Sequence, residues 1–135
     1  MEFHLGRLID HVHLVVQDLE VSLRFYQPLL RALGRDISAD GDGWFHADEL
    51  FVSQGPGATS RLHLAFQAPD RDAVERAWEA GIAAGGRDNG APGERRYHPG
   101  YYAAYLLDPD GNNIEAVHHG PAMRSAPSVT VVPEI

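Results

Sequence analysis

The order of hydrophobic and polar positions predicts a strand and then a helix at the start of the chain. Residues 8–16 (LIDHVHLVV) are apolar and β-branched, a composition that is typical of a strand. Apolar residues at helical spacing follow Asp18, a good N-cap residue, until Gly34 ends the pattern. Pro28 lies inside this segment, and we expect it to kink or shorten the helix because it lacks a backbone N–H.

Short apolar runs separated by polar turns follow the helix. A weak strand is expected near residues 35–39. The turn DGDG at 40–43 then introduces two runs, 44–47 and 49–53, which we interpret as a hairpin. GPGATS, residues 55–60, consists of small and turn-forming residues and has the character of a linker.

The same order of segments begins again at residue 61. RLHLAFQA predicts a strand, Pro69 suits the first turn of a helix, and residues 70–83 have helical periodicity. The segments expected after this helix are a Gly- and Pro-rich loop at 88–100, a strand at 101–108, the turn DPDGNN and a strand at 114–119. Residues 120–135 are interrupted by prolines, and we expect either a mobile tail or an added edge strand there.

An internal repeat with an offset of 52 residues relates the two halves. The aligned pairs are His11 with His63, Asp18 with Asp70, Tyr26 with Trp78, and Gly34 with Gly86. Two units of this kind can each bury one sheet face only by packing together. The sequence therefore predicts a duplicated α+β domain.

The repeat also distinguishes two neighbouring histidines of the first strand. Strand alternation sends the side chains of His11 and His13 to the same face. His11 has an equivalent in His63, whereas His13 aligns with Ala65. We therefore favour a metal for the pair His11 and His63, and a packed, hydrogen-bonded role for His13.

Glu115 is the best candidate for a third metal ligand. It lies in the apolar run NNIEAV directly after a tight turn, where a buried carboxylate is costly unless it is paired or coordinated. Two imidazoles and one carboxylate form a ligand set for Fe(II), Zn or a related ion. Glu115 on the solvent face of an edge strand is the alternative, and periodicity alone does not decide between the two.

Composition restricts the partners. The formal net charge of −8 argues against nucleic acid and anionic membranes, because the 11 Lys and Arg residues form no basic patch. The chain has no cysteine, which excludes disulfides, thiolate ligands and a cysteine nucleophile. No apolar run approaches the length of a membrane span, and the first residues lack the pattern of a signal peptide. We expect a cytoplasmic protein with a small-molecule substrate.

Three motifs resemble the vicinal oxygen chelate superfamily, which includes glyoxalase I, extradiol dioxygenases, fosfomycin-resistance thiol transferases and bleomycin-resistance proteins. They are IDHVHLVVQDLEVSLRFY near the start, RLHLAF in the middle and YLLDPDGNNIEAV near the end, and the last is the most specific. A longer segment, AAGGRDNGAPGERRYHPGYYAAYLLDPDGNNIEAVHH, is similar to a group of small bacterial members.

The resemblance implies an α+β fold of two paired βαβββ modules that form a cupped mixed sheet. Module one would cover about 8–55 and module two about 60–119, within a single domain at 1–119 followed by a C-terminal tail at 120–135. It also implies a homodimer, because modules of the family often build the cup across subunits.

The same resemblance implies a set of metal ligands. The two histidines of the family fall on His11 and His63, and its glutamate falls on Glu115. These residues would hold a divalent ion such as Fe, Zn, Ni, Mn or Co. The fourth ligand of glyoxalase I would fall on or near Glu49, which could equally be a solvated hairpin carboxylate, and His46 is a lesser candidate.

The segment RRYHPGYY, residues 95–102, is a second candidate for chemistry because only the second half contains it. We expect Arg96, Tyr101 and Tyr102 to contact substrate, together with His13 on the first strand. His98 is the candidate for proton transfer, since imidazole titrates near neutral pH. The alternative is an ordinary surface loop.

Together these features predict a divalent-metal-dependent enzyme that acts on a small substrate with two adjacent oxygens. A glyoxalase-like lyase or isomerase is the first hypothesis, and an extradiol-type Fe(II) dioxygenase is the second. The alternative from another class is a metal-free binding protein of the bleomycin-resistance kind.

Overall fold

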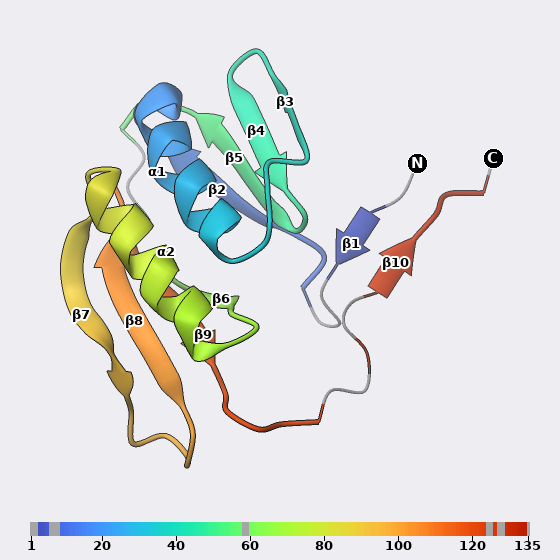
Figure 1. Ribbon diagram of the computed structural model, residues 1–135. Coiled ribbons are helices and arrows are strands. Elements are labelled where there is room, and N and C mark those ends of the chain that lie inside the picture. Colours follow the sequence, from blue (N-terminus) through green and yellow to red (C-terminus); the bar gives the residue numbers. More distant parts are fainter. Residues whose placement is uncertain (1–2, 6–8, 58–59, 124–125, 127–128, 135) are drawn as a thin grey trace.

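The chain folds into two units of the same kind, each a helix packed on a four-stranded sheet (Figure 1). The computed structural model describes residues 3–5, 9–57, 60–123, 126 and 129–134. The elements in chain order are β1 (Phe3–Leu5), β2 (Val12–Val16), α1 (Leu19–Ala32), β3 (Ala39–Gly41), β4 (Trp44–Ala47), β5 (Leu50–Gln54), β6 (His63–Gln67), α2 (Arg71–Ala83), β7 (Arg87–Glu94), β8 (Tyr102–Leu107), β9 (Asn113–His118) and β10 (Val129–Val131).

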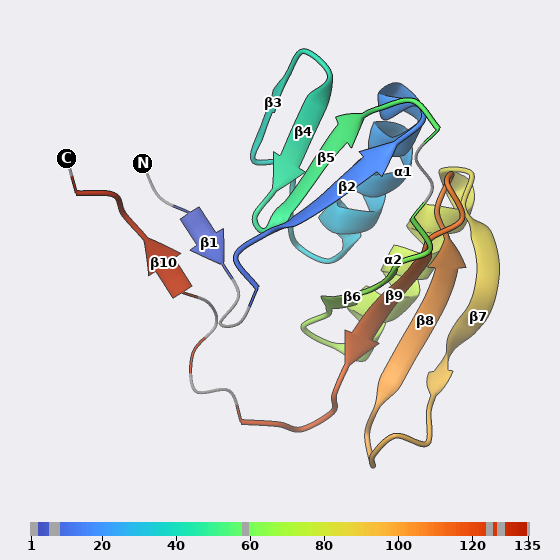
Figure 2. The same cartoon turned by 180° about the vertical axis from the view of Figure 1, so that it is seen from behind.

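The two sheets have the same topology, and this confirms the duplicated βαβββ architecture. The strand order is β2-β5-β4-β3 in module one and β6-β9-β8-β7 in module two. In each sheet the first strand pairs in parallel with the last, and the other pairs are antiparallel. Among the described residues the two sheets are not hydrogen-bonded to each other. In Figure 2 the helices lie behind both sheets, so the two helix-free faces turn toward the same side.

Helix α1 begins where the sequence predicts, because Asp18 caps it. The Asp18 carboxylate accepts a hydrogen bond from the backbone N–H of Val21 at 3.2 Å. The expected shortening at Pro28 is wrong, since the helix continues to Ala32. Buried side chains on both sides of Pro28, Phe25 and Leu29 among them, hold the helix against the core and offset one lost backbone hydrogen bond.

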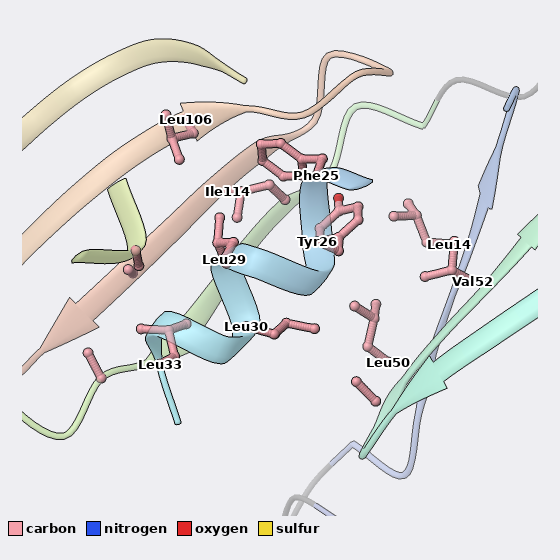
Figure 3. Packing of buried hydrophobic residues seen from close by; sticks show 14 of the residues in the cluster. Leu14, Phe25, Tyr26, Leu29, Leu30, Leu33, Leu50, Val52, Leu106 and Ile114 are labelled. Carbon is pink, nitrogen blue, oxygen red and sulfur yellow. The ribbon is translucent and has the colours of Figure 1, made fainter. Parts of the chain in front are cut away.

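Helix α2 repeats this design and packs against α1. Asp70 accepts from the backbone N–H of Ala73 at 2.7 Å. Where α2 packs on β8, a Cβ added to Gly81 would lie 2.3 Å from Leu106 Cδ1, so this glycine permits the close approach of helix and strand. Figure 3 shows the resulting shared core, in which α1 lies between side chains of both modules; the labelled residues are Leu14, Phe25, Tyr26, Leu29, Leu30, Leu33, Leu50, Val52, Leu106 and Ile114.

The segment 88–100, which was expected to be a loop, begins with strand β7. The pairing of β7 with β8 shifts register between Asp88 and Gly90 and again between Gly90 and Gly93. An edge strand tolerates Pro92 and these glycines, because one of its sides has no ladder to complete. The loop is thus confined to residues 95–101. In module one, β3 starts at Ala39, later than the weak strand expected near 35–39.

The ends of the described chain meet in a separate two-stranded sheet. Strand β10 pairs antiparallel with β1, so part of segment 120–135 forms an added strand. Leu8, the first residue of the expected strand 8–16 and of module one, lies outside the described residues. Neither of the two described helices has the length and apolar character needed to cross a bilayer.

A buried polar cluster joins the helix of module one to the DPDG turn of module two. The Tyr26 hydroxyl donates to Asp108 Oδ2, which also accepts from Asn112 Nδ2 at 3.0 Å. The backbone N–H groups of Asp110 and Asn112 donate to Asp108 Oδ1. Asn112 Oδ1 accepts from the N–H of Leu62 at 3.0 Å. Burial, and then the charge of Asp108, raise the pKa of Tyr26, so its hydroxyl remains a donor.

Candidate functional site

The centre of the candidate site is Glu115, a carboxylate buried on the helix-free face of module two. Its strand β9 lies between β6 and β8, and its neighbours Ile114 and Ala116 point to the helices. Glu115 is 2% exposed, and its Oε1 lies 2.8 Å from His63 Nε2. Its Oε2 accepts a hydrogen bond from the Tyr101 hydroxyl. The sequence left Glu115 undecided between the core and the solvent face, and the structure shows it buried.

His63 covers this carboxylate from the solvent side. The residue opens strand β6, and its side chain is 54% exposed while the partner Glu115 is buried. The sheet register sets Ala65 opposite Glu115, so His63 reaches the carboxylate from two residues earlier on the neighbouring strand. The structure therefore brings together two of the three predicted ligands.

Two tyrosines complete the surroundings of Glu115. Burial, followed by the hydrogen bond to Glu115 and its charge, raises the pKa of Tyr101, so the phenol stays protonated near neutral pH. Tyr105 is the β8 partner of Glu115, its ring centroid is 6.1 Å from that of His63, and burial and the Glu115 charge raise its pKa. The Arg95 guanidinium lies over the Tyr105 ring at 5.3 Å. The site thus presents one carboxylate, one imidazole and two protonated phenols.

His11 lies apart from this cluster. It precedes β2 at the surface, its side chain is 64% exposed, and its Nδ1 lies 2.7 Å from Asp10 Oδ1. Within the described part of the chain, no three side chains of His, Cys, Asp or Glu gather as a set of metal ligands. The donor types of His63 and Glu115 suit a divalent ion, and an imidazole from elsewhere would complete three ligands.

The sheet registers show which residues of module one correspond to the site of module two. Leu64 and Ala65 pair with Ile114 and Glu115, and the equivalent β2 residues Val12 and His13 pair with Leu50 and Phe51. Phe51 therefore holds the position equivalent to that of Glu115. Glu49 is exposed and corresponds to Asn113 in this register. Its backbone carbonyl, not its carboxylate, accepts a hydrogen bond from the N–H of Val12 at 2.7 Å.

The helix-free face of module one carries an aromatic patch made of His13, Trp44, His46 and Phe51. Trp44 is nearly parallel to His46, with centroids 6.0 Å apart, and to Phe51, with centroids 5.7 Å apart. His13 meets Phe51 edge-on and its Nε2 lies 2.7 Å from Ser53 Oγ. Gly41, opposite Trp44, leaves room for the indole, since a Cβ there would be 2.4 Å from the indole nitrogen.

Two of the four candidates from segment 95–102 lie beside Glu115, and one lies on the opposite face of the sheet. Tyr101 contacts Glu115, and the ring of His98 is 5.3 Å from that of Tyr101. Arg96 is exposed on the loop. Tyr102 lies on the opposite face of the sheet, where its hydroxyl donates to Glu75 of α2 at 2.7 Å.

Two residues near Glu115 were missed in the sequence. Tyr105 shares the face of Glu115, and alternation along the apolar run YYAAYLL would have placed it opposite the predicted Glu. His119 follows β9 on the same face as Glu115, and its Nδ1 is 2.9 Å from His98 Nε2. No spacing rule links His119 to His98, because they come from different segments.

Comparison with solved structures places this fold among bacterial proteins. The chain is 32% identical to a glyoxalase/bleomycin resistance protein from Albidiferax ferrireducens T118, with a TM-score of 0.68, covering 82% of this chain and 98% of that one. It is 25% identical to a putative glyoxalase from Bacillus halodurans, with a TM-score of 0.63 and coverage of 82% and 95%. The fold is also that of a glyoxalase/bleomycin resistance protein/dioxygenase family enzyme from Burkholderia phytofirmans PsJN. The chain is 24% identical to it, with a TM-score of 0.64 and coverage of 80% of this chain and 95% of that one.

A model of a protein family gives the broader assignment. No curated protein matches the chain. The model described as the Glyoxalase/Bleomycin resistance protein/Dioxygenase superfamily matches residues 8–116. Members of this superfamily are largely enzymes that act on small molecules and often bind divalent metals, and some are non-enzymatic binding proteins. The chain belongs to the glyoxalase/bleomycin resistance/dioxygenase superfamily.

Proposed function

We propose that the protein is a divalent-metal-dependent enzyme that acts on a small substrate with two adjacent oxygens, bound on the helix-free faces. The observation that carries this proposal is the pairing of buried Glu115 with half-exposed His63. Burying a carboxylate is costly unless a positive charge or coordination balances it. A neutral imidazole supplies only a hydrogen bond, whereas a divalent ion held by both side chains supplies the missing charge.

His11 is proposed as the third ligand. Its ring contacts the adjacent Asp10 at the surface, so turning it away breaks one exposed hydrogen bond. Such interactions contribute little to stability because water replaces them. We also propose a homodimer, which offers a second route, since His11 of one copy could complete the pair His63 and Glu115 of the other. Size-exclusion chromatography with light scattering tests the dimer.

The chain's own residues have defined roles in this proposal. A bound ion would supply Lewis acidity to the substrate oxygens. Tyr101, a protonated phenol, holds Oε2 of Glu115. Glu115 Oε1 and His63 Nε2 are the atoms that would hold the ion, in place of the hydrogen bond between them. Arg96, exposed on the loop, and His13, on the helix-free face of module one, are proposed substrate contacts. His98, whose ring packs against that of Tyr101, is proposed to exchange a proton with the substrate itself.

Phe51 favours the dioxygenase hypothesis over the lyase hypothesis. The lyase hypothesis includes a fourth ligand, a carboxylate from module one. The position equivalent to Glu115 carries Phe51, and the candidate carboxylate Glu49 corresponds to Asn113 instead. Two histidines and one carboxylate leave more positions open for substrate and a second reactant. The aromatic patch beside these positions also suits a flat substrate ring.

A metal-free binding protein is the second candidate function. The aromatic patch favours it, because stacked aromatic rings can bind a flat apolar ligand by packing alone. In that case a polar group of a flat ligand would bind the exposed side of His63, whose Nε2 lies against Glu115.

Metal content separates these functions. The wild type, His63→Ala and Glu115→Gln are purified without chelators, and metal is measured before and after adding Fe(II), Zn(II), Mn(II), Ni(II) and Co(II). The control is His118→Ala, because alternation along β9 sets His118 on the face opposite to Glu115, with its Nδ1 3.2 Å from the carbonyl oxygen of Ala68. We expect a stoichiometric ion in the wild type and control and its loss in the other two. Absence of binding in all four proteins overturns the enzyme proposal.

Where metal binds, the reaction class is tested with a panel of catechols and thiol adducts of 2-oxoaldehydes. Oxygen uptake with a catechol supports the dioxygenase. Turnover of an adduct without oxygen uptake supports the lyase or isomerase.

A further inference from the structure

His98 and His119 form a hydrogen-bonded imidazole pair beside the site. His98 Nε2 and His119 Nδ1 are 2.9 Å apart, whereas the ring centroids are 5.1 Å apart, so the rings meet at facing edges. His98 Nδ1 lies 2.9 Å from the carbonyl oxygen of Pro99, which can only accept. His98 Nδ1 therefore carries a hydrogen, its Nε2 accepts in the neutral ring, and His119 Nδ1 donates.

The pair packs against the ring of Tyr101. The Tyr101 centroid is 5.3 Å from that of His98 and 5.2 Å from that of His119, and both contacts are edge-on. Tyr97 meets Tyr101 at 4.9 Å, also edge-on. The phenol is held among three rings, with its hydroxyl on Glu115.

The backbone is shaped to bring the two histidines together. Gly100 and Gly120 both have positive φ, +87° and +82°, and a Cβ on Gly120 would lie 3.0 Å from Cα and from O of Gly100. The N–H of Arg95 donates to the carbonyl of Tyr101, and the N–H of Tyr101 donates to that of His98. The loop 95–101 is thus closed on itself and fits closely against the end of β9.

We propose that His98 and His119 are positioning residues that hold the loop 95–101 on β9 and keep the Tyr101 hydroxyl on Glu115. The role concerns the hydrogen bonding of Glu115 and goes beyond the proposed function, because it holds whether Glu115 binds a metal or not. Groups that hydrogen-bond a ligand carboxylate fix its orientation and its basicity. Without the pair, Tyr101 can rotate away from Glu115.

The experiment is proton and nitrogen NMR on the full metal-free chain. The hydroxyl proton of Tyr101 on Glu115 is expected at low field and is assigned by its absence in Tyr101→Phe. His119→Ala removes the donor to His98, and we expect the hydroxyl resonance to be lost. His119→Asn supplies an amide N–H close to the position of Nδ1, and we expect it to restore the resonance. His118→Ala, one residue away, is the control and should retain it.

The nitrogen shifts of His98 give an independent measurement. They should report a hydrogen on Nδ1 and an accepting Nε2, as the contacts with the Pro99 carbonyl and with His119 require. A resonance that persists in His119→Ala, or one absent from the wild type, overturns the positioning role. Because no metal is present in this experiment, neither result bears on the metal proposal, which the measurement of metal content tests separately.

Discussion

Phe51 and Glu115 occupy the same position in the two modules, opposite His13 and Ala65 in sheets of identical order. One half therefore offers an aromatic ring where the other offers a buried carboxylate. The single carboxylate keeps the local negative charge low, which matters in a chain with a formal net charge of −8. In the proposed function, a divalent ion held by this carboxylate and two neutral histidines would keep one net positive charge for the substrate oxygens.

The two neighbouring histidines of the first strand should differ in metal binding. We expect His11→Ala to lower the affinity for Zn(II) or Co(II) at least about tenfold, because it removes a proposed ligand. His13→Ala should change it little, since His13 hydrogen-bonds Ser53 and packs on Phe51. Isothermal titration calorimetry checks both. The opposite order would show that His13 is the ligand.

The buried cluster at the DPDG turn should contribute strongly to stability. Tyr26→Phe removes one donor to the buried Asp108, and we expect a loss of about 1–3 kcal/mol in the free energy of unfolding. Tyr102→Phe is the matched control, because its hydroxyl bonds the exposed Glu75 and should matter by less than about 1 kcal/mol. Urea denaturation measures both. Equal losses would contradict the importance of the buried position.

Asp110 should make stability depend on pH. Burial raises the pKa of Asp110 above its unfolded value, and Asp108 adds to this, while the N–H of Gln17 opposes it. The folded state thus binds the proton more readily, so ionised Asp110 destabilises the fold above the folded pKa. The penalty vanishes below the unfolded pKa, about 3.9.

Asp110→Asn should therefore raise the melting temperature at neutral pH, and the difference should shrink toward zero in acid. The amide oxygen can still accept from Gln17. Thermal unfolding followed by circular dichroism between neutral and acid pH measures this. The control is Asp42→Asn in the exposed turn. A stabilisation by Asp110→Asn that is constant with pH would contradict the assignment.

Gly41 should control the conformation of the aromatic patch. In Gly41→Ala the new methyl group would occupy space taken by the Trp44 indole, which must turn away from β3. We expect a shift in the emission of Trp44, measured in a Trp78→Phe background so that one indole remains. The spectrum of Trp78→Phe alone is the reference. An unchanged emission would mean that the strand moves instead.

The sequence predicts most of the fold because its signals are local. Asp18 caps the first helix, Gly34 ends it, and the repeat shows that the chain is duplicated. Pro69 was expected in the first turn of the second helix, but it precedes the N-cap residue Asp70. The error at β7 has a clear cause. Its glycines and Pro92 suggest a loop, and only pairing with β8 at a sheet edge makes this segment a strand.

Less of the site could be predicted, because contacts across strands depend on register. Periodicity left Glu115 undecided between the core and the solvent, and the packing of β9 between two strands determines that it is buried. The positions of Glu49 and Phe51 follow from pairing with β2, which spacing along the chain does not reveal. The contact of His98 with His119 depends on a loop that closes on itself.

The link between Tyr26 and Asp108 also limits how the molecule can move. It ties a helix of one module to a turn of the other inside a shared core. A hinge motion that opened the two sheets would expose this hydrogen bond and break it, at a high cost in free energy. We therefore expect the two modules to move as one rigid body, with movement around Glu115 confined to the loop 95–101 and to exposed side chains.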